Sequence, residues 1–150
     1  MRVFLYNLNS DLIIYQTAFS SKRTGIAQGV SQSPVRCHIR SQDITATDTD
    51  YYNLFDNRVK FAKKGYYNVI VLYSAVLAFD STLETSYNSS SSDGENSLPC
   101  THYYKSGSIN VKENYVINAP KDSYFAPQIC NKNTGWEFSM TVVIRPLFTE

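Results

Sequence analysis

The sequence is short of several patterns, and each shortage excludes a class of protein. The formal net charge is only +1 over 150 residues, and the basic residues are scattered. A nucleic-acid binder or a protein that docks on an acidic membrane needs a concentrated basic surface. No apolar stretch reaches the length of a membrane-spanning helix. We therefore expect no nucleic-acid partner and no membrane insertion.

Cysteine and histidine are scarce, with three and two residues respectively. Cys37, Cys100 and Cys130 form an odd, widely spaced set without the CxxC or Cys/His spacing of a zinc site. A secreted scaffold held by disulfides usually has an even number of cysteines. We expect three reduced thiols, and a disulfide between Cys100 and Cys130 remains the alternative.

The first 21 residues lack the pattern of a cleavable signal peptide. Asp11 interrupts their apolar run, and no small-residue cleavage site follows. We expect synthesis in a cytoplasm without export by a cleaved signal.

Signatures of catalysis are also missing: GxSxG, the P-loop, the Rossmann fingerprint and HExxH do not occur. Cys100 and His102 would share a face of a strand, which makes them the local candidates for a Cys–His contact or a metal. No third ligand is apparent beside them. The acidic stretch 43–50 lacks the Gly and the closing Glu of a calcium loop. We therefore predict no catalytic residue, no metal and no cofactor.

Aromatic residues are plentiful, with twelve Tyr and eight Phe, and Asn, Ser and Thr are common. Alanine and leucine, which favour helices, are sparse. This balance favours strands joined by polar turns over a helical bundle. We predict an all-β, antiparallel β-sandwich of about eight to ten strands, jelly-roll or immunoglobulin-like, in a single domain over residues 1–150. The Cys–Trp–Cys spacing of an immunoglobulin domain is missing, because Trp136 follows all three cysteines.

One long run, "GYYNVIVLYSAVLAF" at 65–79, is rich in β-branched and aromatic residues, which suit a pleated strand. With a period of two, one face carries Gly65, Tyr67, Val69, Val71, Tyr73 and Ala75, and the other carries Tyr66, Asn68, Ile70, Leu72, Ser74 and Val76. Both faces are apolar from about residue 69 onward. This pattern indicates a strand covered on both sides, in the middle of a sandwich or at a subunit contact.

Further elements follow from local patterns. Residues 2–8 and 12–19 are predicted strands, and residues 81–99, with a serine run and Asp-Gly, are predicted to be an exposed loop or hairpin tip. A final strand is predicted at 135–148, where alternate residues are apolar and Pro146 ends the strand. Three connections without strands are predicted, at 20–35, at 43–57 and, between Pro120 and Pro127, at 120–127.

The stretch "FAKKGYYNVIVLYSAVL" resembles the signature of the C1q/tumour-necrosis-factor-like jelly roll. In that family a Phe precedes a short turn, and Gly-x-Tyr-x-apolar then opens a central strand. Here the matching residues are Phe61, Gly65, Tyr67 and Val69. The family's closing strand is apolar and ends at the C-terminus, as "WEFSMTVVIRPLF" does. The resemblance implies a β-sandwich of the jelly-roll type.

The resemblance also implies self-association, because members of this class typically form homotrimers that bury aromatic residues against the three-fold axis. We therefore expect a subunit interface at Tyr67, Val69, Val71 and Tyr73. Trimeric jelly-roll modules without a collagen stalk, signal peptide or membrane anchor are common in bacterial-virus particles, and this small, neutral, Tyr/Asn/Ser/Thr-rich chain is similar to them. The implied function is that of a non-enzymatic virion protein: a capsid decoration, head fibre or attachment component. Such a protein is made in the host cytoplasm, is located in the virion, and has other virion proteins such as the major capsid protein among its partners.

A carbohydrate- or receptor-binding β-sandwich module is the alternative. Adjacent tyrosines on a strand place one ring on each face, and an exposed ring can stack on a sugar. Tyr103 and Tyr104 are therefore the candidate ligand-binding residues, with a host-surface glycan as the candidate partner. A cellular C1q-like ligand is a third hypothesis, which the missing signal peptide disfavours.

Overall fold

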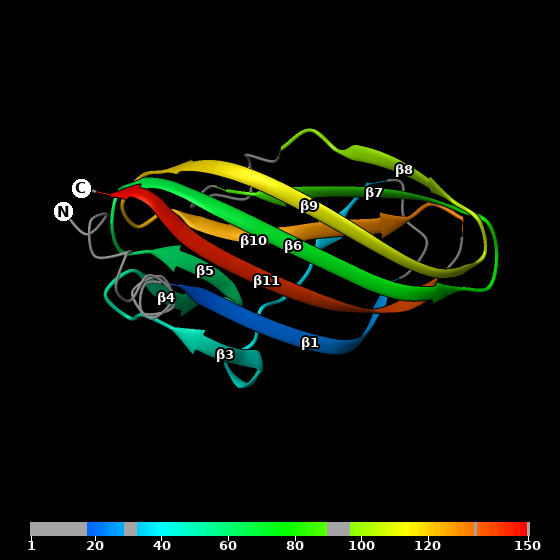
Figure 1. Ribbon diagram of the computed structural model, residues 1–150, viewed down its shortest axis with the longest axis horizontal. Coiled ribbons are helices and arrows are strands. Elements are labelled where there is room, and N and C mark those ends of the chain that lie inside the picture. The colour runs from blue at the N-terminus through cyan, green and yellow to red at the C-terminus, as the bar shows by residue number, and fades with distance from the viewer. Residues whose placement is uncertain (1–17, 29–32, 90–96, 134, 150) are drawn as a thin grey trace, which may run out of the picture.

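A computed structural model describes residues 18–28, 33–89, 97–133 and 135–149. The described residues form eleven strands and one short 3-10 helix. The strands make two antiparallel sheets that pack face to face (Figure 1). One sheet has the order β3-β1-β11-β6-β9, and the other has the order β4-β5-β10-β7-β8 with β2 paired to β10. The predicted all-β sandwich is confirmed.

The five-stranded sheet consists of β1 (Phe19–Gln28), β3 (Ile44–Thr47), β6 (Gly65–Leu77), β9 (Gly107–Ala119) and β11 (Trp136–Thr149). The second sheet consists of β2 (Val35–Arg36), β4 (Tyr52–Phe55), β5 (Arg58–Phe61), β7 (Ser81–Asn88), β8 (Cys100–Tyr104) and β10 (Tyr124–Asn131). The 3-10 helix η2 spans Ser41–Asp43. Within the described ranges, no helix is long and apolar enough to cross a membrane.

Strand β6 is the long β-branched run, and it lies inside its sheet. It pairs with β9 over its full length, from Gly65 opposite Ala119 to Leu77 opposite Gly107, and with β11 on its other side. Residues of odd number from Gly65 to Tyr73 are buried, whereas those of even number are exposed or half-buried. The predicted alternation of this strand is therefore confirmed.

The inward side of β6 carries Tyr67, Val69, Val71 and Tyr73, which are at most 1% exposed within the single chain. Their neighbours are core residues: the ring of Tyr67 lies 4.4 Å from that of Phe61. Because a neighbouring subunit cannot touch side chains that the second sheet already covers, these four residues belong to the domain core and not to a subunit contact. Self-association itself stays a prediction, and it now concerns the opposite face of the strand.

Several expected connections are strands instead. Residues 81–88 form β7, although they were expected to begin a loop, because their polar side chains are buried and hydrogen-bonded: Ser86 Oγ donates to Gln128 Oε1 at 2.8 Å. Strand β10 runs through the connection expected at 120–127, and the carbonyl of Pro127 accepts the amide of Cys37 at 2.8 Å. Pro127 has no N–H to donate, but its carbonyl takes part in the hydrogen bonding of the sheet.

Two boundaries also differ from expectation. Strand β11 continues past Pro146 to Thr149, with a shift of register between Pro146 and Phe148. Strand β1 occupies part of the expected loop at 20–35, and β3 and β4 occupy much of the connection expected at 43–57. The strand expected at 2–8 lies outside the described residues, as does almost all of the one expected at 12–19.

Candidate functional site

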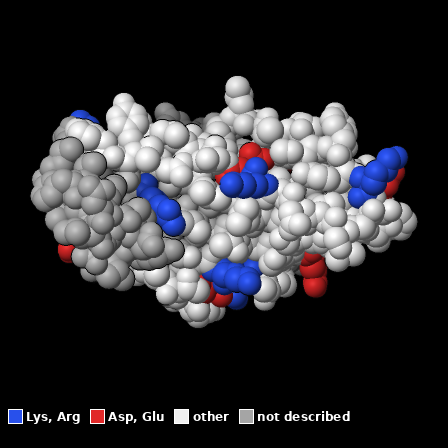
Figure 2. All heavy atoms as spheres, in the orientation of Figure 1, with Lys and Arg blue, Asp and Glu red and all other residues white. Residues whose placement is uncertain are grey.

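The outward side of the five-stranded sheet, here called the outer face, carries large apolar side chains in contact with solvent. Exposures range from 38% to 75% in the set Tyr66, Leu72, Val76, Val116 and Phe148. The space-filling view shows a mostly uncharged surface on which both basic and acidic side chains are few and separated (Figure 2). An exposed apolar surface of this kind typically marks a contact with another molecule.

The aromatic part of the outer face lies at one end of the sheet. Phe148 of β11 stands directly opposite Tyr66 of β6. Val116 of β9 stands opposite Asn68, one outward position further along β6. The three apolar side chains therefore lie on adjacent strands within two outward rows. Nearer the middle of β6, Ile70 and Val143 form a half-buried pair, which extends the apolar surface along the sheet.

The contact predicted at Tyr67, Val69, Val71 and Tyr73 lies on the same strand as this apolar surface but on the buried side of it. The side of β6 that is free for a contact is the side that the second sheet does not cover. The even-numbered residues of β6 gave a usable signal, because Tyr66, Ile70, Leu72 and Val76 are too apolar for a purely solvated face.

A second feature is a hollow of about 320 Å³ at the edge formed by β7 and β8. Tyr103 and Tyr104 both line it, so the structure brings the two predicted ligand-binding residues to one place. The side chain of Tyr103 is on the surface, with the residue 80% exposed, whereas Tyr104 is half-buried. Burial, with the nearby carboxylate of Glu113 as a smaller cause, raises the pKa of Tyr104.

Polar groups surround the rings of this hollow. The carboxylate of Asp80 accepts a hydrogen bond from the amide of Ser106 at 2.9 Å and pairs with Lys105 at 3.5 Å. These two partners hold the pKa of Asp80 below its ordinary value, chiefly through the backbone amide. Asn133 accepts the amide of Thr82 at 2.6 Å. An exposed ring beside amide, carboxylate and ammonium groups is a combination that can bind a polar ring such as a sugar.

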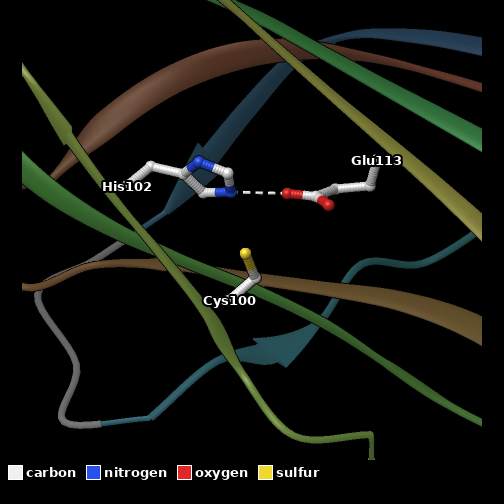
Figure 3. A group of neighbouring side chains, drawn as sticks. All are labelled: Cys100, His102 and Glu113. Carbon is white, nitrogen blue, oxygen red and sulfur yellow. Dashed lines mark hydrogen bonds and ion pairs between the residues drawn. The ribbon is translucent and has the colours of Figure 1, made fainter.

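A third feature joins the two sheets. Cys100 and His102 lie on the same side of β8, as the sequence spacing predicted, and both point toward Glu113 of β9 (Figure 3). His102 Nε2 lies 2.5 Å from Glu113 Oε1, and the Thr85 hydroxyl of β7 donates to the same oxygen at 2.6 Å. One potential ligand atom from each of Cys100, His102 and Glu113 lies within 4.8 Å of the others.

Glu113 is a third potential ligand atom donor, which the spacing of Cys100 and His102 did not predict. A signal for it exists, because the inward positions of β9 are otherwise Ile109, Val111, Tyr115, Ile117 and Ala119. A carboxylate in that alternating series needs a polar partner when buried. Which strand would supply the partner could not be read from the sequence, because β8 and β9 belong to different sheets.

The cysteines themselves are reduced, as expected: Cys37, Cys100 and Cys130 are all free. Cys37 and Cys130 are buried, and Cys100 is exposed. Burial raises the pKa of the Cys37 thiol to about 12. The acidic stretch 43–50 contributes an ion pair, since Asp43 accepts two hydrogen bonds from Arg40 at 2.6 and 3.0 Å.

Comparison with known proteins places this sandwich in the jelly-roll class. No protein-family model matches the chain, and no curated protein matches it in sequence. Solved structures do match in fold. The globular domain of zebrafish complement 1qA protein superimposes with a TM-score of 0.60 at 13% identity, over 89% of this chain and 98% of that one.

Two further structures share the fold. Eiger TNF from S. frugiperda matches with a TM-score of 0.56 at 12% identity, over 89% of this chain and 94% of that one. PRD1 vertex protein P5 matches with a TM-score of 0.58 at 10% identity, over 90% of this chain and 99% of that one. At these identities the likeness establishes the jelly-roll fold, which is the fold that the resemblance of Phe61, Gly65, Tyr67 and Val69 implied.

Proposed function

We propose that the chain is a non-enzymatic structural protein of a bacterial-virus particle: a trimer-forming capsid decoration, head fibre or attachment component. The observation that carries the proposal is the apolar outer face on a jelly-roll sandwich. The fold shared with PRD1 vertex protein P5 supports a place in a virion. In this proposal residues 1–150 act as a single jelly-roll domain, made in the host cytoplasm and incorporated in the virion.

The proposed occupant of the outer face is a second and third copy of the same chain. Tyr66, Phe148 and Val116 form the apolar centre of the contact, and each is 47% to 64% exposed in one chain alone. Removing such side chains from water stabilises association by roughly 25 cal/mol per Å² of apolar surface. The resemblance to C1q and tumour necrosis factor domains supports three-fold rather than two-fold packing.

Binding accounts for the whole proposed role, and no chemical step is part of it. A closed trimer would cover the outer faces and leave the second sheet and the connecting loops outside, where they can meet other virion proteins such as the major capsid protein.

The test is the native mass of the purified protein by light scattering across a dilution series. The proposal predicts a particle near three times 17.0 kDa that persists on dilution. A monomer at every concentration would overturn it, because the outer face would then be stable in water without a partner.

A carbohydrate-binding role is a second candidate, which the hollow at β7 and β8 favours. Tyr103 offers an exposed ring there, and Asp80, Lys105 and Asn133 offer hydrogen-bonding groups around it. The same molecule could carry both functions, with the trimer contact on one sheet and the sugar site at the edge of the other.

Glycan-array binding tests this second role. Tyr103→Ala should abolish binding, whereas Phe55→Ala, which removes another exposed ring in a different part of the same sheet, should leave it unchanged. If no glycan on the array binds, or if both variants bind equally well, the hollow is not a sugar-binding site.

A further inference from the structure

Strands β8 and β9 are the last strands of their respective sheets, and polar side chains connect them. The link runs from His102 Nε2 on β8 to Glu113 Oε1 on β9 over 2.5 Å. Glu113 also accepts the hydroxyl of Thr85, which lies on β7 beside β8. This cluster therefore ties one sheet to the other along an open edge of the sandwich.

The cluster holds more donor groups than a simple hydrogen bond requires. Cys100 lies two residues before His102 on the same side of β8, and its thiol points at the His102–Glu113 pair (Figure 3). Cys100 is exposed, whereas the side chains of His102 and Glu113 are only 23% and 12% exposed. A solvent path therefore reaches the group from the cysteine side, while the other two donors are held by the sandwich.

We propose that Cys100, His102 and Glu113 form a zinc-binding site that fastens β8 to β9. Thiolate sulfur, imidazole nitrogen and carboxylate oxygen are the three protein donors that zinc accepts in tetrahedral sites. Calcium and magnesium prefer oxygen donors alone, so sulfur and nitrogen disfavour them. With three protein ligands, the fourth position of the tetrahedron is left for water or a further group.

The distances allow the site after small side-chain movements. Zn–S bonds of about 2.3 Å and Zn–N bonds of about 2.0 Å place the ligand atoms of one tetrahedral zinc about 3 to 4 Å apart. The three donor atoms here lie within 4.8 Å of one another. The metal would replace the hydrogen bond between His102 and Glu113, and the exposed Cys100 side chain would close the remaining gap.

Neighbouring residues orient two of the three ligands, as the outer partners of metal sites do. Thr85 donates to Glu113 at 2.6 Å and so fixes the direction of the carboxylate. The ring of Tyr104 stacks on the ring of His102, with centroids 6.1 Å apart and planes 25° apart. The ligands come from different sheets, so zinc would bind the folded chain and stabilise it by mass action. This inference does not depend on the proposed virion role.

The first experiment titrates the reduced, metal-stripped full-length protein with zinc chloride in competition with a chromophoric chelator. We expect one zinc per chain, bound at least about tenfold more weakly by each of Cys100→Ser, His102→Gln and Glu113→Gln. Glu137→Gln, which removes an exposed carboxylate from β11, is the matched control and should keep the wild-type affinity. Retained affinity in any of the three ligand variants would overturn the three-ligand site.

Cobalt and heat supply two independent readouts. Co²⁺ in place of zinc should give the near-ultraviolet charge-transfer absorption of a thiolate–cobalt bond, and Cys100→Ser should lose it. Zinc should raise the melting temperature of the wild type and of Glu137→Gln but not of Cys100→Ser. Because Cys100 is exposed, that variant should fold without metal, and its far-ultraviolet circular dichroism verifies this. Absence of the thiolate band in folded wild-type protein would overturn the proposal.

Discussion

Gly65 at the start of β6 lies directly opposite Thr149 near the end of β11, and the two backbones almost touch. A Cβ atom added to Gly65 would stand 2.8 Å from Thr149 Cα and would also overlap the carbonyl oxygen of Phe148. The register shift between Pro146 and Phe148 precedes this close approach. Gly65 is therefore needed for the space it leaves to a neighbouring strand.

Gly65→Ala should destabilise the protein by roughly 1–3 kcal/mol, because the methyl group would push against backbone atoms that cannot rotate away. Urea unfolding followed by circular dichroism measures the loss. Asn114→Ala, on the exposed side of β9, is the control and should change stability by less than about 0.5 kcal/mol. Equal stability of both variants would mean that β11 can shift its end freely.

Tyr67 links the turn before β6 to the core, because its hydroxyl donates to the carbonyl of Lys63 at 2.5 Å. Burial, with Tyr51 as a smaller cause, raises the pKa of Tyr67 from the ordinary value of 10.0 to about 12. The folded state favours the neutral phenol. Its contribution to stability is therefore complete below about pH 10 and is lost as the pH rises through about 12.

Tyr67→Phe should cost about 1 kcal/mol of unfolding free energy at neutral pH, because the hydrogen bond to Lys63 is lost while the ring packing remains. It should also flatten the fall in stability above about pH 10. Unfolding free energies measured from about pH 7 to about pH 12 test both points, because this range spans the ordinary tyrosine pKa of about 10. Tyr103→Phe, at an exposed position of β8, should keep the wild-type curve, and an identical curve for Tyr67→Phe would contradict the assignment.

The three thiols should react at very different rates. Burial raises the pKa of Cys37 to about 12 and also raises that of Cys130, whereas Cys100 is exposed. Because the thiolate is the reacting form, iodoacetamide at about pH 8 should modify one thiol quickly in metal-free native protein and three after unfolding. Mass spectrometry of the intact protein counts the adducts. Fast modification that persists in Cys100→Ser would show that a buried thiol opens to solvent.

The all-β class could be predicted from the sequence because β6 and β11 carry a regular alternation, which is typical of strands with one buried face. Polar composition misled at β7, where Thr85, Ser86 and Asn88 are buried, since a serine or asparagine gives no sign of whether its partner is protein or water. Prolines misled at β10 and β11, because both strands continue through a proline: Pro127 stays paired with Tyr87, and β11 shifts its register just after Pro146. The register of each strand pair, and the side that each strand buries, depend on contacts between strands that are far apart in the sequence. These contacts cannot be inferred from a single sequence.

The same limit explains the outcome for the candidate sites. Tyr103 and Tyr104 could be proposed locally, and they line one hollow. Cys100 and His102 could be paired locally because their spacing is that of one strand face. Glu113 could not be added, since it joins them only when two edge strands of different sheets meet. Tyr67 and Val71 were assigned to a subunit contact because both sides of this strand are apolar in sequence. Only the position of the second sheet shows which side is buried within the chain.

The two sides of β6 should respond differently to substitution, and this difference tests the proposed trimer. Val116→Asp and Tyr66→Ser, on the outer face, should keep the chain folded and move the midpoint of trimer dissociation at least about tenfold in concentration. For a trimer this is about a hundredfold in the dissociation constant, or about 2.8 kcal/mol per trimer. Val71→Asp buries a charge in the core and should unfold the chain instead.

Val35→Asp is the matched control for Val116→Asp, because Val35 is also an exposed valine but lies on β2, in the other sheet. It should leave both folding and native mass unchanged. Light scattering and circular dichroism on the four variants separate loss of assembly from loss of fold. If Val116→Asp stays as oligomeric as Val35→Asp, the contact lies elsewhere than on the outer face; if both dissociate, the contact involves the second sheet as well.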